Sequence, residues 1–340
     1  NASPALADLW PVFVSGFFGL HNSDSITSLE LVQTNLDAFL SDFEQLVASD
    51  YLMKRATCVP RPNGAGSSTC MQLIVYNIFA AWSISMQFNE TEVLSNEPAK
   101  LKLIRRLNLV VQVSLAMLTF LIEKINATSA DWRTPSTVSS HTKHSMDGDS
   151  RNNNVAAKAS RLEILPVVSV FLHWLSTAST RLVSFDLSSA RESAIFARFQ
   201  KAIIGLLPAV LPAATQYHAA LSTAQGKRRG APPLPEDTEL FPFVPLAAAH
   251  NDVSFMALST IHDSEASFSR RCYKIGLFAL RAAQDVHLVS STRTPLEDPL
   301  HHFASSASTH ISPSPHTGTP LFTTAQAAEL QACFYNPNTT

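Results

Sequence analysis

The side chains of this sequence that are best suited to chemistry are cations grouped in three short clusters. Clustered lysine and arginine side chains bind the phosphates of nucleic acids, because each phosphate accepts charge-assisted hydrogen bonds from them. The overall charge is −2, with 25 Lys and Arg against 27 Asp and Glu, so only a local cluster could act in this way. The balance favours the simpler interpretation, in which the clusters are solvated faces of helices and one loop. The clusters are Lys100, Lys102, Arg105 and Arg106; Lys227, Arg228 and Arg229; and Arg270, Arg271 and Lys274.

Acidic and histidine side chains offer little for catalysis. Glu236, Asp237 and Glu239 stand close together and could in principle hold a metal ion for hydrolysis. The prolines around them instead predict a bent loop, in which the acids cap the following helix or face water. The histidines at 141–144 and 301–302 lie in polar stretches without apolar periodicity, where solvated side chains are expected. We therefore predict no metal site and no cofactor.

The sequence motifs of common enzymes are missing. The chain contains no GxSxG, GxxxxGK[ST], GxGxxG or HExxH. Its four cysteines lie at spacings that match no zinc pattern, and reduced thiols are the expectation for a chain with a large core. We therefore expect no enzymatic activity.

Helices are the elements that must position these clusters. Apolar residues recur every three or four positions over most of the chain, which is the period of an amphipathic helix. Pro208 and Pro212 should kink or split one helix, since proline lacks an amide hydrogen. The longest apolar run, 109–122, contains polar residues and is shorter than the roughly 20 residues of a membrane span, so we expect no membrane contact. Helices are predicted at 27–47, 68–88, from 96 onward, 160–184, 188–222 and 264–288.

Successive helices of this kind predict an all-α fold, an array of antiparallel helical hairpins that stack into a superhelix of TPR-like or solenoid type. No strict repeat is visible, so the hairpins are degenerate. Periodicity stops at 129–160, which predicts a disordered insertion, and after 290, which predicts a mostly disordered tail over 290–340 with a short turn at 323–331. The helical hairpins then occupy 1–128 and 161–289.

A proline-rich segment at 231–250, APPLPEDTELFPFVPLAAAH, interrupts the second group of helices. Its five prolines argue against a regular helix or a central strand. A flexible linker is the alternative, but it would leave six large apolar side chains in water at a cost in free energy. We therefore predict an extended strap that lies across the helical array. The six apolar residues are Leu234, Leu240, Phe241, Phe243, Val244 and Leu246.

The strap carries a resemblance to a known family. Residues 233–246 resemble the LPED…L..F.PL…H motif of the SMG/ever-shorter-telomeres family of nonsense-mediated mRNA decay and telomerase-associated factors. The stretch 165–175, LPVVSVFLHWL, is similar to the family's LPxxKVxxDWL, with Ser169 and His173 in place of lysine and aspartate. Residues 258–276 look most like the SMG-five-type member. The motif residues that carry over as a structural strap are Leu234, Pro235, Glu236, Asp237, Leu240, Phe243, Pro245 and Leu246.

The resemblance implies a non-enzymatic scaffold in nonsense-mediated mRNA decay. Such a scaffold would link a phosphorylated RNA helicase to decay or dephosphorylation factors, with a paralogous SMG subunit and a phosphatase among its partners, in the cytoplasm and the nucleus. One alternative is a telomerase-associated helical module that binds RNA or telomeric nucleic acid weakly through the basic clusters. The other is an unrelated helical-array adaptor. The family's phosphoserine-binding and PIN nuclease-like domains match no residues of this chain.

Overall fold

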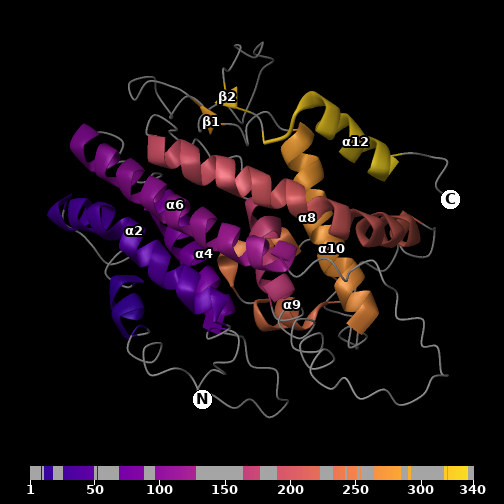
Figure 1. Ribbon diagram of the computed structural model, residues 1–340, viewed down its shortest axis with the longest axis horizontal. Helices are drawn as coiled ribbons and strands as arrows, with labels where there is room; N and C mark the ends of the chain where they lie inside the picture. Colours follow the sequence, from indigo (N-terminus) through magenta and orange to yellow (C-terminus); the bar gives the residue numbers. More distant parts are fainter. Residues whose placement is uncertain are drawn as a thin grey trace, which may run out of the picture.

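The fold was analysed in a computed structural model, which describes most of the expected helices (Figure 1). The described residues are 9, 11–17, 26–49, 52, 69–87, 96–127, 164–176, 190–222, 233–241, 243–250, 253, 264–284, 290–291, 318–319 and 321–335. Their helices are the short helix at 11–17, α2 (Ile26–Ala48), α4 (Thr69–Gln87), α6 (Glu97–Ala127), the 164–176 helix (Ile164–Ser176), α8 (Ala190–Ser222), α9 (Pro235–Glu239), the 3-10 helix η3 (Val244–His250), α10 (Ser264–Gln284) and α12 (Thr324–Tyr335).

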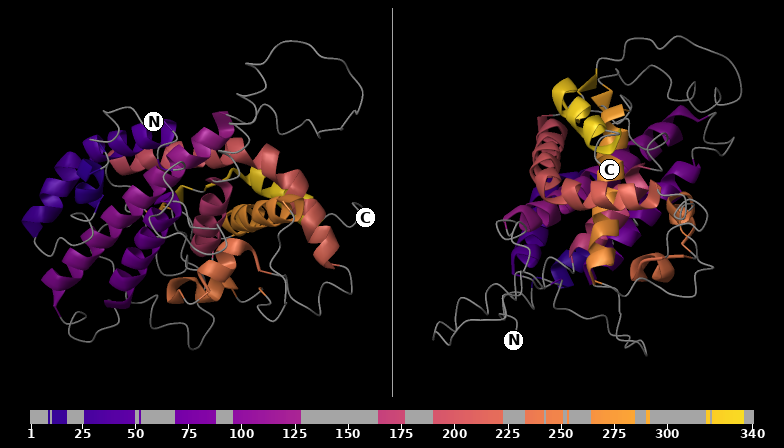
Figure 2. Two further views of the ribbon diagram at one scale, coloured as in Figure 1. Left: turned by 90° about the horizontal axis from the view of Figure 1, so that it is seen from below. Right: turned by 90° about the vertical axis from the view of Figure 1, so that its right-hand side faces the viewer.

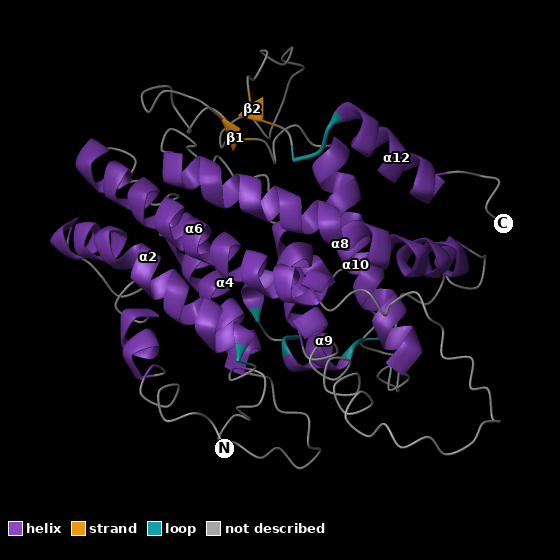
Figure 3. Ribbon diagram, viewed as in Figure 1, coloured by secondary structure: helices purple, strands orange, loops and turns teal. Residues whose placement is uncertain are grey.

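The predicted all-α class is confirmed. Figure 3 shows that the described part of the chain is almost entirely helical, and the predicted helices begin and end within a few residues of the observed α2, α4, α6, α8 and α10. The strands within the described residues are two short antiparallel partners, β1 (Ser290–Ser291) and β2 (Gly318–Thr319), in which Ser290 pairs with Thr319. The helical array is therefore the whole of the described architecture apart from this pair.

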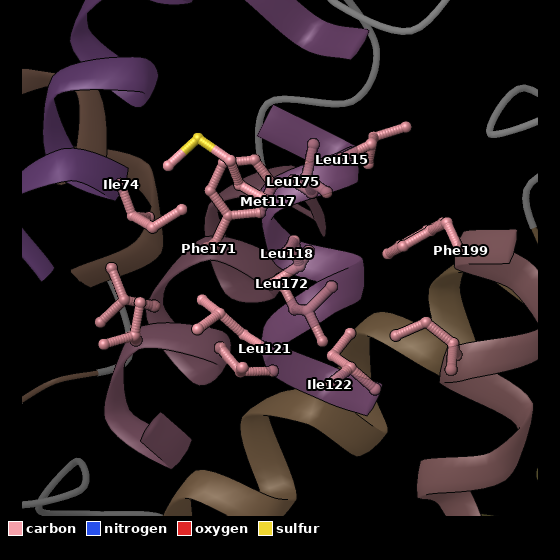
Figure 4. Packing of buried hydrophobic residues seen from close by; sticks show 14 of the residues in the cluster. Ile74, Leu115, Met117, Leu118, Leu121, Ile122, Phe171, Leu172, Leu175 and Phe199 are labelled. Atoms are coloured by element: carbon pink, nitrogen blue, oxygen red, sulfur yellow. The ribbon is translucent and has the colours of Figure 1, made fainter. Parts of the chain in front are cut away.

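Helix α6 lies at the centre of the array. It contacts α2, α4 and α8, and every side chain from Leu109 to Ile122 is buried. A helix that is buried on all sides must be apolar on all sides, which is why this stretch shows a continuous apolar run instead of a stripe. Figure 4 shows its residues Met117, Leu118, Leu121 and Ile122 among Ile74 of α4, Phe171 and Leu172 of the 164–176 helix, and Phe199 of α8.

The two hydroxyl side chains inside this run satisfy their hydrogen bonds within the helix. The Ser114 hydroxyl donates to the Val110 carbonyl at 2.6 Å, and the Thr119 hydroxyl donates to the Leu115 carbonyl at 2.7 Å. Each bond returns to the carbonyl four residues earlier, so the hydroxyl can be buried without a partner from another helix.

Three described helices are long and apolar enough to cross a membrane by length and composition alone, namely Thr69–Gln87, Glu97–Ala127 and Ser193–Leu221. The expectation that no apolar run is long enough to span a membrane is therefore wrong by length and composition. It considered only the run 109–122, which polar residues interrupt. In α6, 83% of the most apolar window is buried inside the protein. The packing of this chain thus covers most of that window in α6, whereas 50% of the window is buried in Thr69–Gln87 and 39% in Ser193–Leu221.

Polar contacts at the edges of the core fix how α2, α6 and α8 lie relative to one another. Lys124 of α6 donates to the carbonyls of Val47 and Ala48, the latter at 3.2 Å, at the C-terminal end of α2. A cation is favoured there because the unpaired carbonyls carry partial negative charge. Arg198 of α8 donates to Glu123 at 2.7 Å and to Glu44 at 3.1 Å, which joins all three helices.

Helix α8 shows which of the two predicted outcomes holds, because the two prolines do not split it. It continues through Pro208 and Pro212, and it follows a bent path in the left view of Figure 2. Both prolines are exposed, so water can reach the helix surface where proline removes an amide donor.

The C-terminal segment differs from its prediction. Residues 324–335 form α12, where we predicted a mostly disordered tail with a short turn at 323–331. The helix packs on α10 and α8, and its buried Leu330 and Phe334 join the core. Two side chains facing a preformed surface are too weak a periodic signal to detect in the sequence. The predicted insertion at 129–160 lies outside the described residues.

Replacing Phe43 tests whether the α2–α6 contact is part of one cooperative core. The Phe43 ring is fully buried and lies 5.7 Å from Phe13 and 6.2 Å from Phe120 between ring centroids. Phe43→Ala should lower the free energy of unfolding by about 3–5 kcal/mol, from lost burial and the cavity left behind. Val12→Ala is the control, because Val12 is 63% exposed and should change little. Chemical denaturation followed by circular dichroism measures both, and equal effects would contradict this packing.

Candidate nucleic-acid interface

The first basic cluster lies in the opening turns of α6. Asn96 caps the helix, since its side-chain oxygen accepts a hydrogen bond from the Ala99 amide at 3.2 Å. Lys100 is buried and lies 3.6 Å from the Glu97 carboxylate. Its charge is therefore matched within the helix, and the prediction that it meets nucleic acid is not supported by its position.

The other three cations of this cluster reach the surface. Arg105 is exposed, while Lys102 and Arg106 are half-buried. Residues three and four positions apart share one side of a helix, so these side chains can approach the same partner. Contact with nucleic acid stays a prediction for Lys102, Arg105 and Arg106.

The remaining two clusters have different outcomes. Lys227, Arg228 and Arg229 lie outside the described residues. In the third cluster Arg270 is 1% exposed and Lys274 is 2% exposed, so neither can contact a phosphate at the surface. Arg271 is largely covered as well, because it is engaged with a carboxylate of the strap. The prediction that this third cluster contacts nucleic acid is therefore wrong.

The strap itself is helical where we expected an extended chain. Pro235 begins α9, which ends at Glu239, and η3 begins at Val244. Proline is tolerated in the first turn of a helix, because the amide that it lacks would have no partner there. The Leu234 amide instead donates to the Asp237 carboxylate at 3.1 Å, which caps α9. Pro235 and Pro245 therefore lie in the first turns of helices and not along a strand.

The strap nevertheless covers the array, as predicted. Leu234, Leu240 and Leu246 are buried, and Pro245 is half-buried. Phe243 is half-buried, with its ring centroid 6.2 Å from that of Phe79 on α4. Two of the six apolar residues are the exception, since Phe241 and Val244 are exposed.

Two carboxylates of the strap are buried and bind the third basic cluster. Glu236 accepts two hydrogen bonds from the guanidinium of Arg271, at 2.7 and 2.8 Å. Asp237 accepts a hydrogen bond from the Lys274 ammonium, and its other oxygen lies 3.4 Å from Arg270 Nη2. The expectation that these acids face water or only cap the next helix is therefore wrong. These ion pairs, called the charge lock below, hold α9 against α10.

These contacts also set the ionisation of Asp237. Burial alone would raise the pKa of the carboxyl, but the charges of Lys274 and Arg270, with the hydrogen bonds from Lys274 and the Leu234 amide, lower it below its ordinary value. His250 adds a further polar group, with Nε2 3.9 Å from Asp237 Oδ1. Asp237 is thus held ionised inside the fold.

The second motif, at 165–175, is part of the core. Ser169 is fully buried and donates to the Pro166 carbonyl at 2.9 Å, and His173 is buried too. A lysine and an aspartate at these positions would each bring a charge into the interior. The neutral side chains therefore suit the packing of this helix, and His173 is a core residue.

The described side chains form no group suited to holding a metal. No three of the described His, Cys, Asp and Glu residues lie together as a ligand set. Cys70 and Cys272 are free and buried, and burial raises the pKa of the Cys70 thiol to about 12. Thiols with a raised pKa stay protonated at neutral pH and are inert.

Sequence reasoning missed the pairing between the strap and α10. The signal was present, because two adjacent acids at 236–237 are matched by three cations within one turn and a half at 270–274. Nothing local links segments about 35 residues apart, so both groups were interpreted as solvated. Arg198, which joins three helices, was missed for the same reason.

These observations define the class of the protein as an all-α helical array with an ion-paired strap. The chain belongs to the family described as the Est1 DNA/RNA binding domain, whose model matches residues 6–250. This confirms the resemblance to the SMG/ever-shorter-telomeres family, and it makes the chain a helical module of a nucleic-acid-binding family. No curated protein and no solved structure gives a significant match.

Replacing Asp237 tests the charge lock. Asp237→Asn leaves the cations of α10 without their carboxylate and should lower the free energy of unfolding by about 3–5 kcal/mol. Glu44→Gln is the control, because its ion pair with Arg198 is half-exposed and should contribute less than about 1 kcal/mol. Thermal melts followed by circular dichroism measure both.

The lowered pKa of Asp237 also predicts how the stability of the fold depends on pH. The pKa of Asp237 is lower in the folded chain than in the unfolded chain, so its contribution is complete above the unfolded value of about 3.9. It is lost as the pH falls through the folded value. Asp237→Asn should therefore flatten the loss of stability at acid pH, and an unchanged acid profile would show that Asp237 is not held by these charges.

Proposed function

We propose that this chain is a non-enzymatic helical scaffold of nonsense-mediated mRNA decay that contacts nucleic acid through the opening turns of α6. The observation that carries the proposal is the family match over residues 6–250. The SMG-five-type member is the subtype that we favour, on the residues at 258–276.

The choice of α6 follows from where the positive charge reaches the surface. Glu236 and Asp237 offset two of the three positive charges of the third cluster, and Arg270 and Lys274 are buried, so the cluster adds little to the outer field. Arg105 is exposed, and Lys102 and Arg106 lie on the same side of the helix. Three neighbouring cations suit the phosphates of a nucleic acid strand, which release counterions when they are bound.

Exposed apolar side chains support the scaffold part of the proposal. Phe79 of α4 and Val244 of η3 are both exposed. Phe79 also contacts Phe243, the residue that precedes Val244. Aromatic and other large apolar groups at the surface are typical of protein interfaces. The partners that we propose are a phosphorylated RNA helicase complex, a paralogous SMG subunit and a phosphatase, in the cytoplasm and the nucleus and without membrane contact.

Charge reversal tests the nucleic-acid contact. Arg105→Glu should weaken binding of a fluorescein-labelled single-stranded RNA and lower the salt dependence of the affinity by about one phosphate contact. Lys201→Glu is the matched control, because Lys201 is exposed on α8 and the change in net charge is the same. Fluorescence anisotropy between about 50 and 200 mM salt measures both. Equal loss in the two variants would place the contact elsewhere.

The same binding experiment also tests the alternative of a telomerase-associated module. A labelled DNA strand of telomeric repeat sequence serves as a second probe beside the RNA. Tighter binding of the telomeric strand than of RNA would favour a telomerase-associated module over a decay scaffold.

The absence of catalysis and of phosphopeptide capture is a separate prediction. Capture of a phosphate needs several cations that converge in one pocket, and cleavage of RNA needs acidic metal ligands. Glu236 and Asp237 are already bound to cations of α10. We expect no cleavage of RNA with added metal ions, and no micromolar binding of helicase-derived phosphopeptides by calorimetry. Cleavage that a chelator abolishes, or binding that depends on the phosphate, would show an active module.

A further inference from the structure

Helix α4 carries no charged residue, yet a large part of its surface is left uncovered. Its sequence, Thr69–Gln87, contains no Asp, Glu, Lys or Arg. Only 50% of its most apolar window is buried, against 83% for α6. A helix that is apolar on every side is normally buried on every side. The outer face of α4 therefore has the composition of an interior surface.

The uncovered side chains of α4 follow the spacing of a seam between two helices. Phe79 and Met86 are each 45% exposed, and Gln72 is exposed seven residues before Phe79. Val75 and Trp82 are half-buried, three residues after Gln72 and Phe79 respectively. Alternating steps of three and four residues place these five side chains along one line of the helix. This is the a and d pattern with which helices pair in coiled coils.

Two aromatic side chains in this line lie outside the core of the chain. The ring centroid of Phe79 is 5.9 Å from that of Trp82 and 6.2 Å from that of Phe243 in the strap. Neither Phe79 nor Trp82 is among the described side chains that form the core or pack against it. Val244, next to Phe243, is 63% exposed and widens the apolar surface. Aromatic and methionine side chains are enriched at the centres of protein interfaces, where charged side chains are depleted.

The absence of charge on α4 restricts what can cover this line. Nucleic acid and anionic lipid are bound through lysine and arginine, and α4 has neither. In paired helices the residues beside the seam, at the e and g positions, select a partner by charge. On α4 these positions are Tyr76, Ile78, Ser83 and Ser85, all uncharged. Such a face does not repel a second copy of itself, and it carries no charge that would favour a different chain.

We propose that α4 pairs with α4 of a second copy of this chain, in antiparallel orientation about a two-fold axis that passes between Ala80 and Ala81. A two-fold axis brings the same face of both copies together, so the face must be complementary to itself. An uncharged line of apolar side chains meets this condition. The inference rests on the scaffold part of the proposed function, because it names the occupant of the same surface.

The position of the axis follows from the a and d pattern. Antiparallel helices place an a position of one copy against a d position of the other. With the axis between residues 80 and 81, Phe79 of each copy faces Trp82 of the other, and Val75 faces Met86. Every position of the line then meets an apolar side chain except Gln72, which lies at the end of the seam.

Analytical ultracentrifugation of the full chain tests the pairing. The average mass should rise with protein concentration from 37.0 kDa toward twice that value. Phe79→Glu should weaken the dimer by about thirtyfold or more, the loss typical of a central interface residue, because it buries two charges in the seam. Leu101→Glu is the matched control, since Leu101 is 43% exposed on α6 and the change in charge is the same. The control should dimerise like the unchanged chain.

A second disruption guards against a folding defect. Circular dichroism should show the helical content of the unchanged chain in each variant. Met86→Glu, at the other exposed position of the line, should weaken the dimer as well, and it replaces Phe79→Glu if that variant does not fold.

Opposite charges test the register. Trp82→Lys alone should also weaken the dimer. An equimolar mixture of the Phe79→Glu and Trp82→Lys chains should associate again, because the two introduced charges face each other and the second Phe79–Trp82 contact is unchanged.

Three results would overturn the proposal. A chain that stays monomeric at every concentration would leave this face of α4 to a different protein. A dimer that Phe79→Glu and Met86→Glu do not weaken would place the contact elsewhere. Failure of the mixture to associate would show that the two α4 helices do not meet in this register.

The pairing and the nucleic-acid contact can fail separately. Arg105→Glu should dimerise normally, because Arg105 is not part of the line on α4. A dimer that binds no RNA would contradict the nucleic-acid contact alone, and a monomer that binds RNA would contradict the pairing alone.

Discussion

The burial of α6 on every side is the constraint on which the rest of the structure depends. From Leu109 to Ile122 every side chain is buried, so neighbours must lie on all faces of this helix. Helices α2, α4 and α8 contact it directly, and the 164–176 helix joins them in the core. The hairpins on either side of residues 128–163 therefore form one hydrophobic core and not two independent units. Lys124 and Arg198 then fix the angles at the rim of this core.

The second organising contact is the charge lock between the strap and α10. Buried ion pairs contribute little net stability compared with apolar packing, but they are costly to break and admit few alternative partners. Asp237 and Glu236 therefore specify where α9 lies more than they strengthen the fold. Phe243 at the other end of the strap reaches Phe79 of α4, so the strap connects the first helices of the array with α10. The structural unit thus extends past residue 250, where the family match ends.

The same lock decides which charges remain for function. Arg270 and Lys274 of α10 are buried in the interior, while Arg105 stays in solvent at the start of α6. Two basic clusters of similar composition in one fold can therefore differ in burial, one in the interior and the other at the surface. The distinction depends on which acidic residues the folded chain brings to each cluster, and net charge alone does not reveal it.

Much of this protein is determined locally and could be predicted from sequence. The bounds of α2 and α4 and the start of α6 follow from apolar spacing, because a helix is stabilised by residues within one or two turns. The strap was also predicted to cover the array, since Leu234 and Leu246 are too apolar to remain in water. Tertiary structure alone decided the rest. Arg270 and Lys274 are buried, and α12 packs against Gly276, because each outcome depends on residues that are distant in sequence and is set by the packing of the helices.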